Sequence, residues 1–345
     1  MYTRQPKKLL IMNILDILRR YSDADHRLSQ KEIVELLKSK YEMDADRKSV
    51  KRNLMNLIDF GYNIEYTETV RRGRDGEEEI IYTDWYLLRD FSDAELRLLI
   101  DSLLFSKHIP HRQCRRLIEK IEGLSNNYFK SKVRHVSSLP VTQLQNAELF
   151  YTVEMLDEAI EKKRQVTFLY CDYGTDKKLH PRINKDGGAK VYKVNPYQMV
   201  TSNGRYYLIA NADSYENISH YRLDRIREIE IAEDYARPLR SIKEFENGLD
   251  LPKHMAEHIY MFSGESARVT MKTQPWMASD LIDWFGDGVE FSDETENCVT
   301  ATVTANLQAM RFWALQYSPF VTVVSPKGLV EEIKENLREA LGKYE

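Results

Sequence analysis

The chain has 345 residues, of which 42% are hydrophobic and 30% are charged, and its formal net charge is −4. This composition is typical of a folded globular protein of two to four domains and excludes a disordered chain. Its three widely spaced cysteines exclude a disulfide framework, and the lack of any apolar run near ~20 residues excludes a membrane-spanning helix.

The charge is unevenly distributed along the chain. Residues 1–76 contain sixteen Lys and Arg against twelve Asp and Glu, whereas residues 240–345 contain ten against seventeen. The sequence therefore predicts that only the basic amino-terminal part faces a polyanion.

Residues 1–89 are predicted to form three helices followed by a hairpin. An amphipathic helix comes first, and Ser29 and Glu32 then begin a second helix as a capping box, in which each side chain bonds the backbone N–H of the other residue. Asp46 is expected to cap a third helix that runs from Arg47 to about Phe60 and ends at Gly61.

The third helix has two chemically different sides when it is projected at about 100° per residue. Val50, Leu54, Leu57 and Ile58 form the apolar side. Lys48, Ser49, Arg52 and Asn56 fall on the opposite side, and Lys51 and Asn53 flank them. These residue types bind base edges and phosphates in the major groove. A solvated face is the alternative for a lone helix. Because this helix is third in a compact three-helix unit, we predict that it reads duplex DNA.

The hairpin that follows carries three arginines near its tip: Arg71, Arg72 and Arg74. Such a tip suits a wing that lies against phosphates or in the minor groove. A solvated hairpin tip is the alternative. Together with the third helix, the hairpin favours a DNA-binding head.

Residues 90–149 are predicted to form a helical connector. One helix begins at Ser92 and a second runs from His111 to about Leu124, with a basic side. We interpret this region as a spacer or a dimer contact, with auxiliary phosphate binding as the alternative.

Residues 150–238 are predicted to contain one helix and about five short strands. Three segments organise this region: Asn195–Val200, Arg205–Ile209 and His220–Ile226. The first two are separated by Ser202-Asn203-Gly204, a turn with residues that accept positive φ. The third alternates apolar and charged residues as a half-buried strand does. Arginines and tyrosines thus gather on one small sheet, which suits anionic, planar ligands.

These segments resemble the WYL domain of bacterial transcription regulators. Tyr206-Tyr207-Leu208 stands where the family has Trp-Tyr-Leu, so an aromatic residue is kept at the first position. Pro196-Tyr197 and the run from Arg222 to Ile226 match the family's flanking segments. The resemblance implies an Sm-like barrel that senses a nucleotide or nucleic-acid-like ligand. The head likewise resembles the winged helix-turn-helix of DeoR-like regulators, the usual amino-terminal partner of such a domain.

Candidate ligand-binding residues follow from the motif and from side-chain chemistry. The positions that match the motif are Tyr197, Tyr206, Tyr207, Arg222 and Arg225, and the additional candidates are His180, Arg182 and Arg205. Core packing is the alternative role for Tyr207, and Asp224 is expected to orient an arginine. Strict alternation places Arg225 opposite Arg222, so the two line one site only if a bulge intervenes or the strand ends.

Residues 239–345 are predicted to form a small α+β sandwich of alternating strands and helices. This region resembles the carboxy-terminal extension that accompanies WYL domains and helps to join two protomers. The expected fold class is therefore multidomain α+β, in the order winged helix-turn-helix, helical connector, Sm-like barrel and sandwich.

One segment has the pattern of a zinc enzyme. His254-Met255-Ala256-Glu257-His258 places two histidines one helical turn apart. Because the sequence shows no third ligand near this short helix, we expect no metal, no cofactor and no catalytic residue, and hence no enzyme.

The leading hypothesis is a ligand-responsive, DNA-binding transcription regulator. It would bind a double-stranded operator as a homodimer and respond to a nucleotide or single-stranded nucleic-acid effector. We expect it in the cytoplasm, associated with the nucleoid, and expect no membrane partner. An accessory protein that binds nucleic acid and modulates a defence nuclease, CRISPR-type or anti-phage, is the alternative. A metalloenzyme at His254 and His258 is the third reading.

Overall fold

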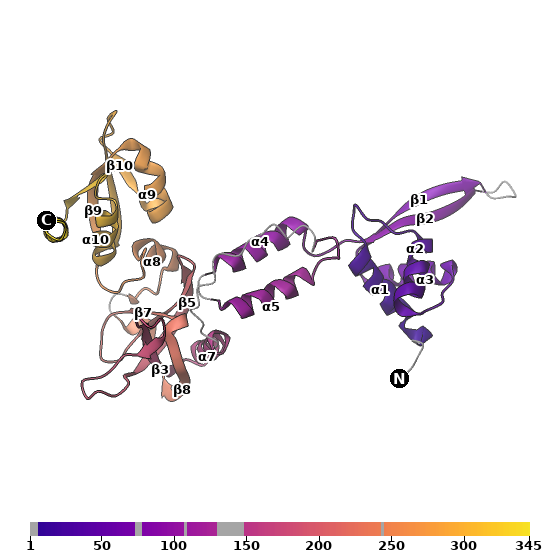
Figure 1. Ribbon diagram of the computed structural model, residues 1–345, viewed down its shortest axis with the longest axis horizontal. Coiled ribbons are helices and arrows are strands. Elements are labelled where there is room, and N and C mark those ends of the chain that lie inside the picture. Colours follow the sequence, from indigo (N-terminus) through magenta and orange to yellow (C-terminus); the bar gives the residue numbers. More distant parts are fainter. Residues whose placement is uncertain (1–5, 73–77, 107–108, 130–147, 243–244) are drawn as a thin grey trace. The chain divides into compact units, whose positions relative to one another are not determined.

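The computed structural model describes residues 6–72, 78–106, 109–129, 148–242 and 245–345. The chain divides into two units, residues 1–106 with 111–142 and residues 107–110 with 143–345. Helices and sheets occur in both (Figure 1), so the predicted multidomain α+β class is confirmed. The division at residues 89, 149 and 238 and the names of the individual subfolds stay predictions.

The first unit opens with a short 3-10 helix and three α-helices, which are η1 (Lys7–Leu9), α1 (Leu10–Tyr21), α2 (Gln30–Tyr41) and α3 (Arg47–Phe60). The Ser29 hydroxyl accepts from the Glu32 N–H and the Glu32 carboxylate accepts from the Ser29 N–H. Asp46 accepts from the Ser49 N–H at the start of α3, and Gly61 ends it with a φ of +112°. The predicted capping signals of α2 and α3 are therefore confirmed.

A long antiparallel hairpin of β1 (Ile64–Arg72) and β2 (Glu78–Leu87) follows α3. Its base is fixed by Trp85, which is fully buried together with Ile14, Leu18 and Leu54 of the helices. The hairpin is thus attached to the three-helix core by a large apolar side chain, while its far end extends beyond that core (Figure 1).

The connector helices α4 (Asp93–Phe105) and α5 (His111–Glu122) pack against each other. Polar contacts join their ends to α1. Asn126 Nδ2 donates to the Ser22 carbonyl at 3.2 Å, and Arg89 pairs with Asp23 at 3.4 Å and with Asp93 at 3.1 Å. Because the Arg89 side chain is only 15% exposed, its charge is largely shielded from water and depends on these carboxylates.

The second unit begins with α7 (Leu149–Glu161), which packs on a six-stranded antiparallel sheet. The strands are β3 (Arg164–Tyr173), β4 (Leu179–Pro181), β5 (Val191–Ser202), β6 (Arg205–Asn211), β7 (Ser219–Arg222) and β8 (Ile226–Tyr235). Their order is β4-β3-β5-β6-β7, and β8 pairs with β3. Asn203 and Gly204 have φ values of +51° and +71°, so the predicted turn between β5 and β6 is confirmed.

The third predicted segment is not one strand. β7 ends at Arg222, and a 3-10 helix, η3 (Leu223–Arg225), precedes β8. The alternation from Tyr221 to Asp224 was therefore misleading, because Leu223 and Asp224 are both buried. A single turn of 3-10 helix places two successive side chains inward in a way that a strand cannot.

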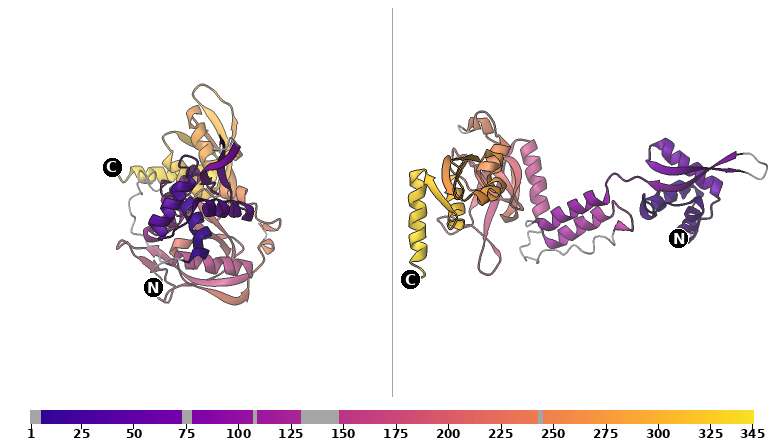
Figure 2. Two further views of the ribbon diagram at one scale, coloured as in Figure 1. Left: turned by 90° about the vertical axis from the view of Figure 1, so that its right-hand side faces the viewer. Right: turned by 90° about the horizontal axis from the view of Figure 1, so that it is seen from above.

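A second sheet and its helices complete this unit. The elements after β8 are η4 (Leu239–Ser241), α8 (Leu251–Glu257), β9 (Ser266–Thr273), η6 (Pro275–Met277), α9 (Ala278–Phe285), η7 (Gly286–Gly288), β10 (Glu290–Ser292), β11 (Val299–Asn306), α10 (Leu307–Gln316), β12 (Val321–Ser325) and α11 (Lys327–Leu341). The antiparallel sheet has the order β10-β11-β9-β12 and packs through Met271 and Ala301 against Trp313 of α10. Figure 2 (right) shows α11, in yellow, at the outer edge of this part.

Within the described ranges, no helix combines the length and the apolar character that crossing a bilayer requires.

Candidate nucleic-acid interface and ligand-binding surface

The inner and outer sides of α3 are arranged as predicted. Val50 and Leu54 are fully buried and Leu57 is 3% exposed. On the other side Lys48, Arg52 and Asn56 are exposed. Among the described residues these three side chains have no hydrogen bond or ion pair, so their polar groups are available to an external partner.

The other three predicted side chains of α3 are engaged within the protein. Asn53 Nδ2 donates to the Ser49 carbonyl at 2.7 Å, and the Ser49 hydroxyl donates to Asp46 at 2.8 Å. The Lys51 ammonium lies 3.8 Å from the centroid of the Tyr82 ring of β2. Lys51 therefore joins α3 to the hairpin by a cation–π contact.

Two lysines that the sequence analysis did not select lie beside α3. A hollow of about 730 Å³ is lined by Lys7 and Lys8 of η1 together with Ser49, Arg52 and Asn53. The Lys7-Lys8 pair is visible in the sequence as a basic doublet. Because it precedes the first predicted helix, its position beside α3 could not be inferred from the sequence. With Arg52, these lysines place three cations beside the outer side of α3, where Asp44 and Asp46 line the same hollow.

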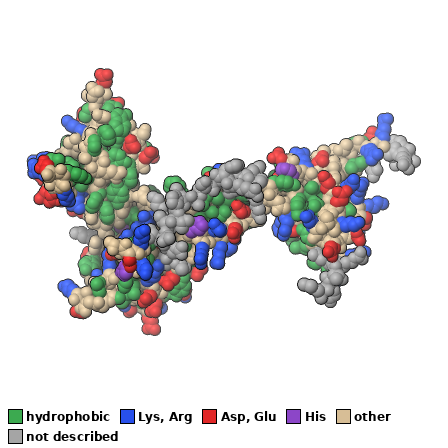
Figure 3. Space-filling model, in the orientation of Figure 1, with side chains coloured by type: hydrophobic (Ala, Val, Ile, Leu, Met, Phe, Trp, Pro, Cys, Tyr) green, Lys and Arg blue, Asp and Glu red, His purple; other side chains and the backbone are tan. Residues whose placement is uncertain are grey.

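Two of the three predicted hairpin arginines, Arg71 and Arg72, lie at the end of β1. Arg71 and Arg72 are exposed, but the register places Glu79 opposite Arg71 and Glu78 opposite Arg72. Arg74 lies outside the described residues. Figure 3 shows Lys and Arg side chains along the far end of the hairpin, with acidic side chains among those on the head.

In the second unit, Arg182, Arg222 and Arg225 with Asp172 and Asp224 form a group of ion pairs, named here the Arg222 cluster. Arg222 is paired with Tyr207 across the strands, and Arg205 follows the same side of β6. Arg222 binds Asp224 through two parallel hydrogen bonds, Nε to Oδ1 at 3.0 Å and Nη2 to Oδ2 at 2.6 Å. Arg205 Nη1 lies 3.9 Å from the same Asp224 carboxylate. As expected, Asp224 orients an arginine.

Asp172 holds two further predicted arginines. Arg182 Nε donates to Asp172 at 2.7 Å and Arg225 Nη1 donates to it at 3.0 Å. The hydrogen bond from Arg182 holds the pKa of Asp172 below its usual value, with burial opposing the change. Asp172 is therefore ionised at neutral pH and bridges two cations.

Tyr170, which the sequence analysis did not select, connects these two groups. Its hydroxyl accepts the Arg222 backbone N–H at 3.0 Å, and the Arg182 guanidinium lies 4.9 Å from its ring centroid. Arg222 and Arg225 thus contribute to one surface because β7 ends between them. The neighbouring Tyr173 hydroxyl is buried and has no hydrogen-bond partner among the described residues.

The remaining predicted ligand residues lie elsewhere. Tyr206 packs on the α7 side of the sheet, opposite Tyr207. The Tyr197 hydroxyl is buried without a partner among the described residues, and burial raises the pKa of Tyr197 to about 12. His180 is exposed and its ring lies 3.0 Å from Asp176. The surface that the structure assembles is therefore smaller than the predicted set.

Comparison with known proteins identifies two domains in the second unit. Residues 151–231 match the WYL domain, and residues 265–341 match the WCX domain. No curated protein matches the chain.

Two solved structures are similar to the chain at low sequence identity. Proteasome accessory factor B/C (PafBC) of Arthrobacter aurescens is 14% identical with a TM-score of 0.30, over 99% of this chain and 50% of that one. This chain thus spans half the length of that protein. A CRISPR Cas-related protein is 12% identical with a TM-score of 0.38, over 97% of this chain and 85% of that one. The domain matches show that the chain carries a WYL domain followed by a WCX domain.

Proposed function

We propose that the protein is a transcription regulator that binds duplex DNA through α3 and senses an effector through its WYL domain. The observation that carries the DNA-binding role is the division of α3 into a buried apolar side and an outer side with Lys48, Arg52 and Asn56. Arg and Asn form bidentate contacts with guanine and adenine in the major groove, and Lys7 and Lys8 beside Arg52 supply phosphate contacts. The proposal includes no catalytic role.

The effector role rests on the Arg222 cluster. Its two carboxylates, Asp224 and Asp172, hold three guanidinium groups in place, and each guanidinium keeps further N–H donors for a ligand. The Arg182 guanidinium lies over the ring of the buried Tyr170, and Tyr207 is the cross-strand partner of Arg222. Planar guanidinium forks beside aromatic rings suit the phosphates and bases of a nucleotide or of single-stranded nucleic acid.

Substitution of Arg52 tests the DNA-binding role. Arg52→Ala is expected to weaken binding to a selected operator by about 1–3 kcal/mol if Arg52 makes a bidentate base contact. Fluorescence anisotropy with a labelled duplex measures this difference. The matched control is Arg97→Ala, which removes the same charge from an exposed pair with Asp101 on α4.

Affinities of Arg52→Ala and Arg97→Ala that equal the wild-type value would remove α3 from the recognition role. Equal weakening by both variants would indicate a general charge effect instead. Such a loss would appear equally on operator and random duplexes, because phosphate contacts carry no sequence information.

An accessory protein that modulates a defence nuclease is the second candidate. Both candidates use a basic head, but only the regulator requires sequence-specific binding. The side chains of Lys48, Arg52 and Asn56 on α3, which are exposed and unpaired among the described residues, favour the regulator, because they can contact base edges. A footprint confined to one sequence would exclude the accessory role as the main one.

A further inference from the structure

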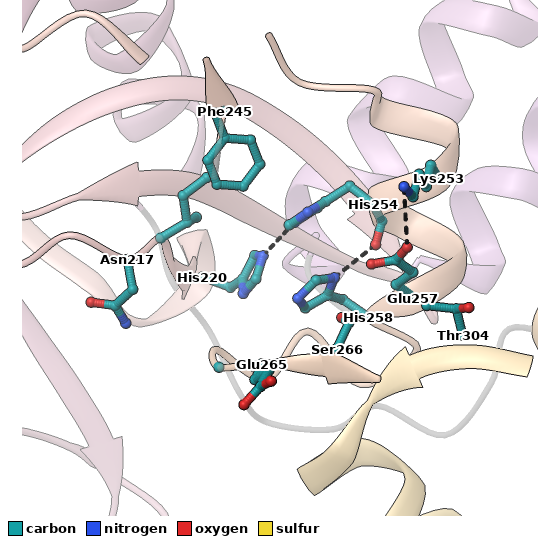
Figure 4. A pocket seen from close by; sticks show the side chains of 12 residues that line it. Asn217, His220, Phe245, Lys253, His254, Glu257, His258, Glu265, Ser266 and Thr304 are labelled. Atoms are coloured by element: carbon teal, nitrogen blue, oxygen red, sulfur yellow. Dashed lines mark hydrogen bonds and ion pairs between the residues drawn. The ribbon is translucent and has the colours of Figure 1, made fainter. Parts of the chain in front are cut away.

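Three histidines from distant parts of the sequence meet at one cavity in the second unit. His220 comes from β7, His254 from α8, and His258 follows the end of α8. The ring centroid of His220 lies 5.1 Å from that of His254 and 5.3 Å from that of His258. The rings of His254 and His258 stack with their centroids 4.1 Å apart. Figure 4 shows the three rings gathered at the cavity wall. The sequence pattern supplied two of these histidines, and the fold supplies the third.

The hydrogen bonds show which nitrogen atoms have lone pairs. His258 Nδ1 lies 2.9 Å from the His254 carbonyl, which only accepts, so Nδ1 carries the proton and Nε2 of a neutral ring is left with a lone pair. This arrangement, an imidazole held by a backbone carbonyl through its far nitrogen, is the usual support of a metal-binding histidine. His220 Nε2 and His254 Nε2 lie 2.8 Å apart and share one proton.

The cavity around the histidines favours a cation. It has a volume of about 560 Å³, and the carboxylates of Glu257 and Glu265 line it against one ammonium, that of Lys253. The Lys253 side chain is 70% exposed and lies 3.9 Å from Glu257. Among the charged side chains that line the cavity, the two carboxylates therefore outnumber the single ammonium.

We propose that His220 and His254, joined by His258, bind a divalent transition-metal ion of the zinc type in this cavity. Zn–N distances of about 2.0–2.1 Å at a tetrahedral angle place two ligating nitrogens about 3.3 Å apart, so the His220–His254 pair has to open by roughly 0.5 Å. A ring centroid lies about 1.1 Å behind its nitrogen, which gives an expected centroid separation of about 5.2 Å. The two separations from His220 agree with this value, whereas the His254–His258 separation of 4.1 Å is too short for it.

The third ligand has to move into place. In the conformation that the structure describes, no three His, Cys, Asp or Glu side chains of the described residues form a ready metal centre. His258 stacks too closely on His254, and its ring must tilt away from that stack to direct Nε2 at the ion. The proposed site is therefore assembled on binding, and the ion would tie α8 to β7 of the WYL sheet.

Metal binding by the full chain, freed of any tag and dialysed against chelator, tests this proposal. The probe is Co²⁺, whose visible absorption becomes intense in a tetrahedral site, followed by displacement with Zn²⁺. We expect one equivalent to bind and the thermal unfolding temperature to rise, because the ion binds only the folded state. An absence of the tetrahedral Co²⁺ spectrum in the wild-type protein would overturn the proposal.

Single substitutions assign the ligands. His220→Gln and His254→Gln are expected to weaken Co²⁺ binding by more than the roughly 10- to 100-fold that loss of a residue supporting a ligand costs, with a smaller loss for His258→Gln. His180→Gln is the control, since it removes an exposed histidine of the same unit. Circular dichroism of the metal-free variants establishes that they fold. Unchanged binding by folded His220→Gln would place the ion elsewhere and contradict the proposal.

Discussion

Arg222 illustrates how far a residue's role depends on its partner. Its side chain is 15% exposed and its fork is occupied by Asp224, which is itself 7% exposed. A buried charge that loses its partner is costly, so the pair is maintained in the unliganded protein. An anionic effector would bind the donors that Asp224 leaves free, or compete with Asp224 for the fork.

Substitution of Arg222 separates sensing from DNA binding. Arg222→Ala is expected to leave basal operator affinity within about twofold, because α3 lies in the other unit, and to abolish the change in affinity caused by the effector. Operator titrations with and without the effector measure both quantities. Loss of both basal binding and the effector response would point to a folding defect. Arg222→Lys is the second variant, because it keeps the positive charge beside Asp224 but lacks the planar guanidinium.

Protonation of Asp172, in the Arg222 cluster, is expected to make the stability of the fold depend on pH. The pKa of Asp172 in the folded protein lies below the usual 3.8, chiefly through the Arg182 hydrogen bond. A carboxylate with a depressed pKa contributes stability that is complete above its unfolded-state pKa and lost as pH falls through the folded-state pKa. We therefore expect Asp172→Asn to lessen the loss of stability below about pH 4, as measured by urea unfolding at several pH values. An unchanged acid limb would show that the Asp172 bridge adds no stability.

The sequence predicted helix caps and turns well, because these depend on interactions between neighbouring residues. The Ser29–Glu32 box, the Asp46 cap and the Asn203-Gly204 turn depend only on residues a few positions apart. Long-range contacts were not predictable in this way. Nothing near Lys7, Tyr170 or His220 in the sequence shows what lies beside them after folding.

The error at β7 has the same origin. Alternation from His220 to Ile226 fits a strand. Leu223 and Asp224 are nevertheless both buried, because they lie in the 3-10 helix η3. The tertiary environment of Asp224 therefore overrode the local pattern. This is also why Arg222 and Arg225 share a surface that strict alternation would have divided.

Two glycine substitutions test how the backbone conformation of a glycine affects the stability of α3 and α11. Gly61 ends α3 at a φ of +112° with nothing within 4 Å of an added Cβ, so Gly61→Ala should cost about 1–2 kcal/mol of stability through backbone strain alone. Gly328 lies in the first turn of α11 with the same open space and no positive φ, so Gly328→Ala should add stability, at most the roughly 0.5–1 kcal/mol of a mid-helix glycine. Denaturant unfolding measures both changes, and effects of equal sign would contradict this explanation.

At the scale of the whole molecule, a homodimer is proposed because two heads would then read two half-sites. Two apolar surfaces are candidates for the contact. Leu337 and Leu341 of α11 are 41% and 61% exposed, and Leu98 and Phe105 of α4 are 67% and 69% exposed. Exposed apolar side chains that gather on a helix are typical of interfaces.

Sedimentation velocity distinguishes the two surfaces. We expect Leu337→Ser with Leu341→Ser to weaken the dimer, since α11 belongs to the WCX domain, and Leu98→Ser with Phe105→Ser to leave it intact. The reverse result would place the contact in the connector. A monomeric wild-type protein at all concentrations would contradict the homodimer itself.

The proposed regulatory function depends on recognition of a DNA sequence by α3. Affinity selection of sheared genomic DNA from the source organism, followed by sequencing, tests it most directly when the wild-type protein is compared with Arg52→Ala. We predict that the wild type enriches a few sites that share an inverted repeat and that Arg52→Ala loses this enrichment. A flat profile that depends on salt but not on sequence, and that is the same for both proteins, would contradict recognition by α3.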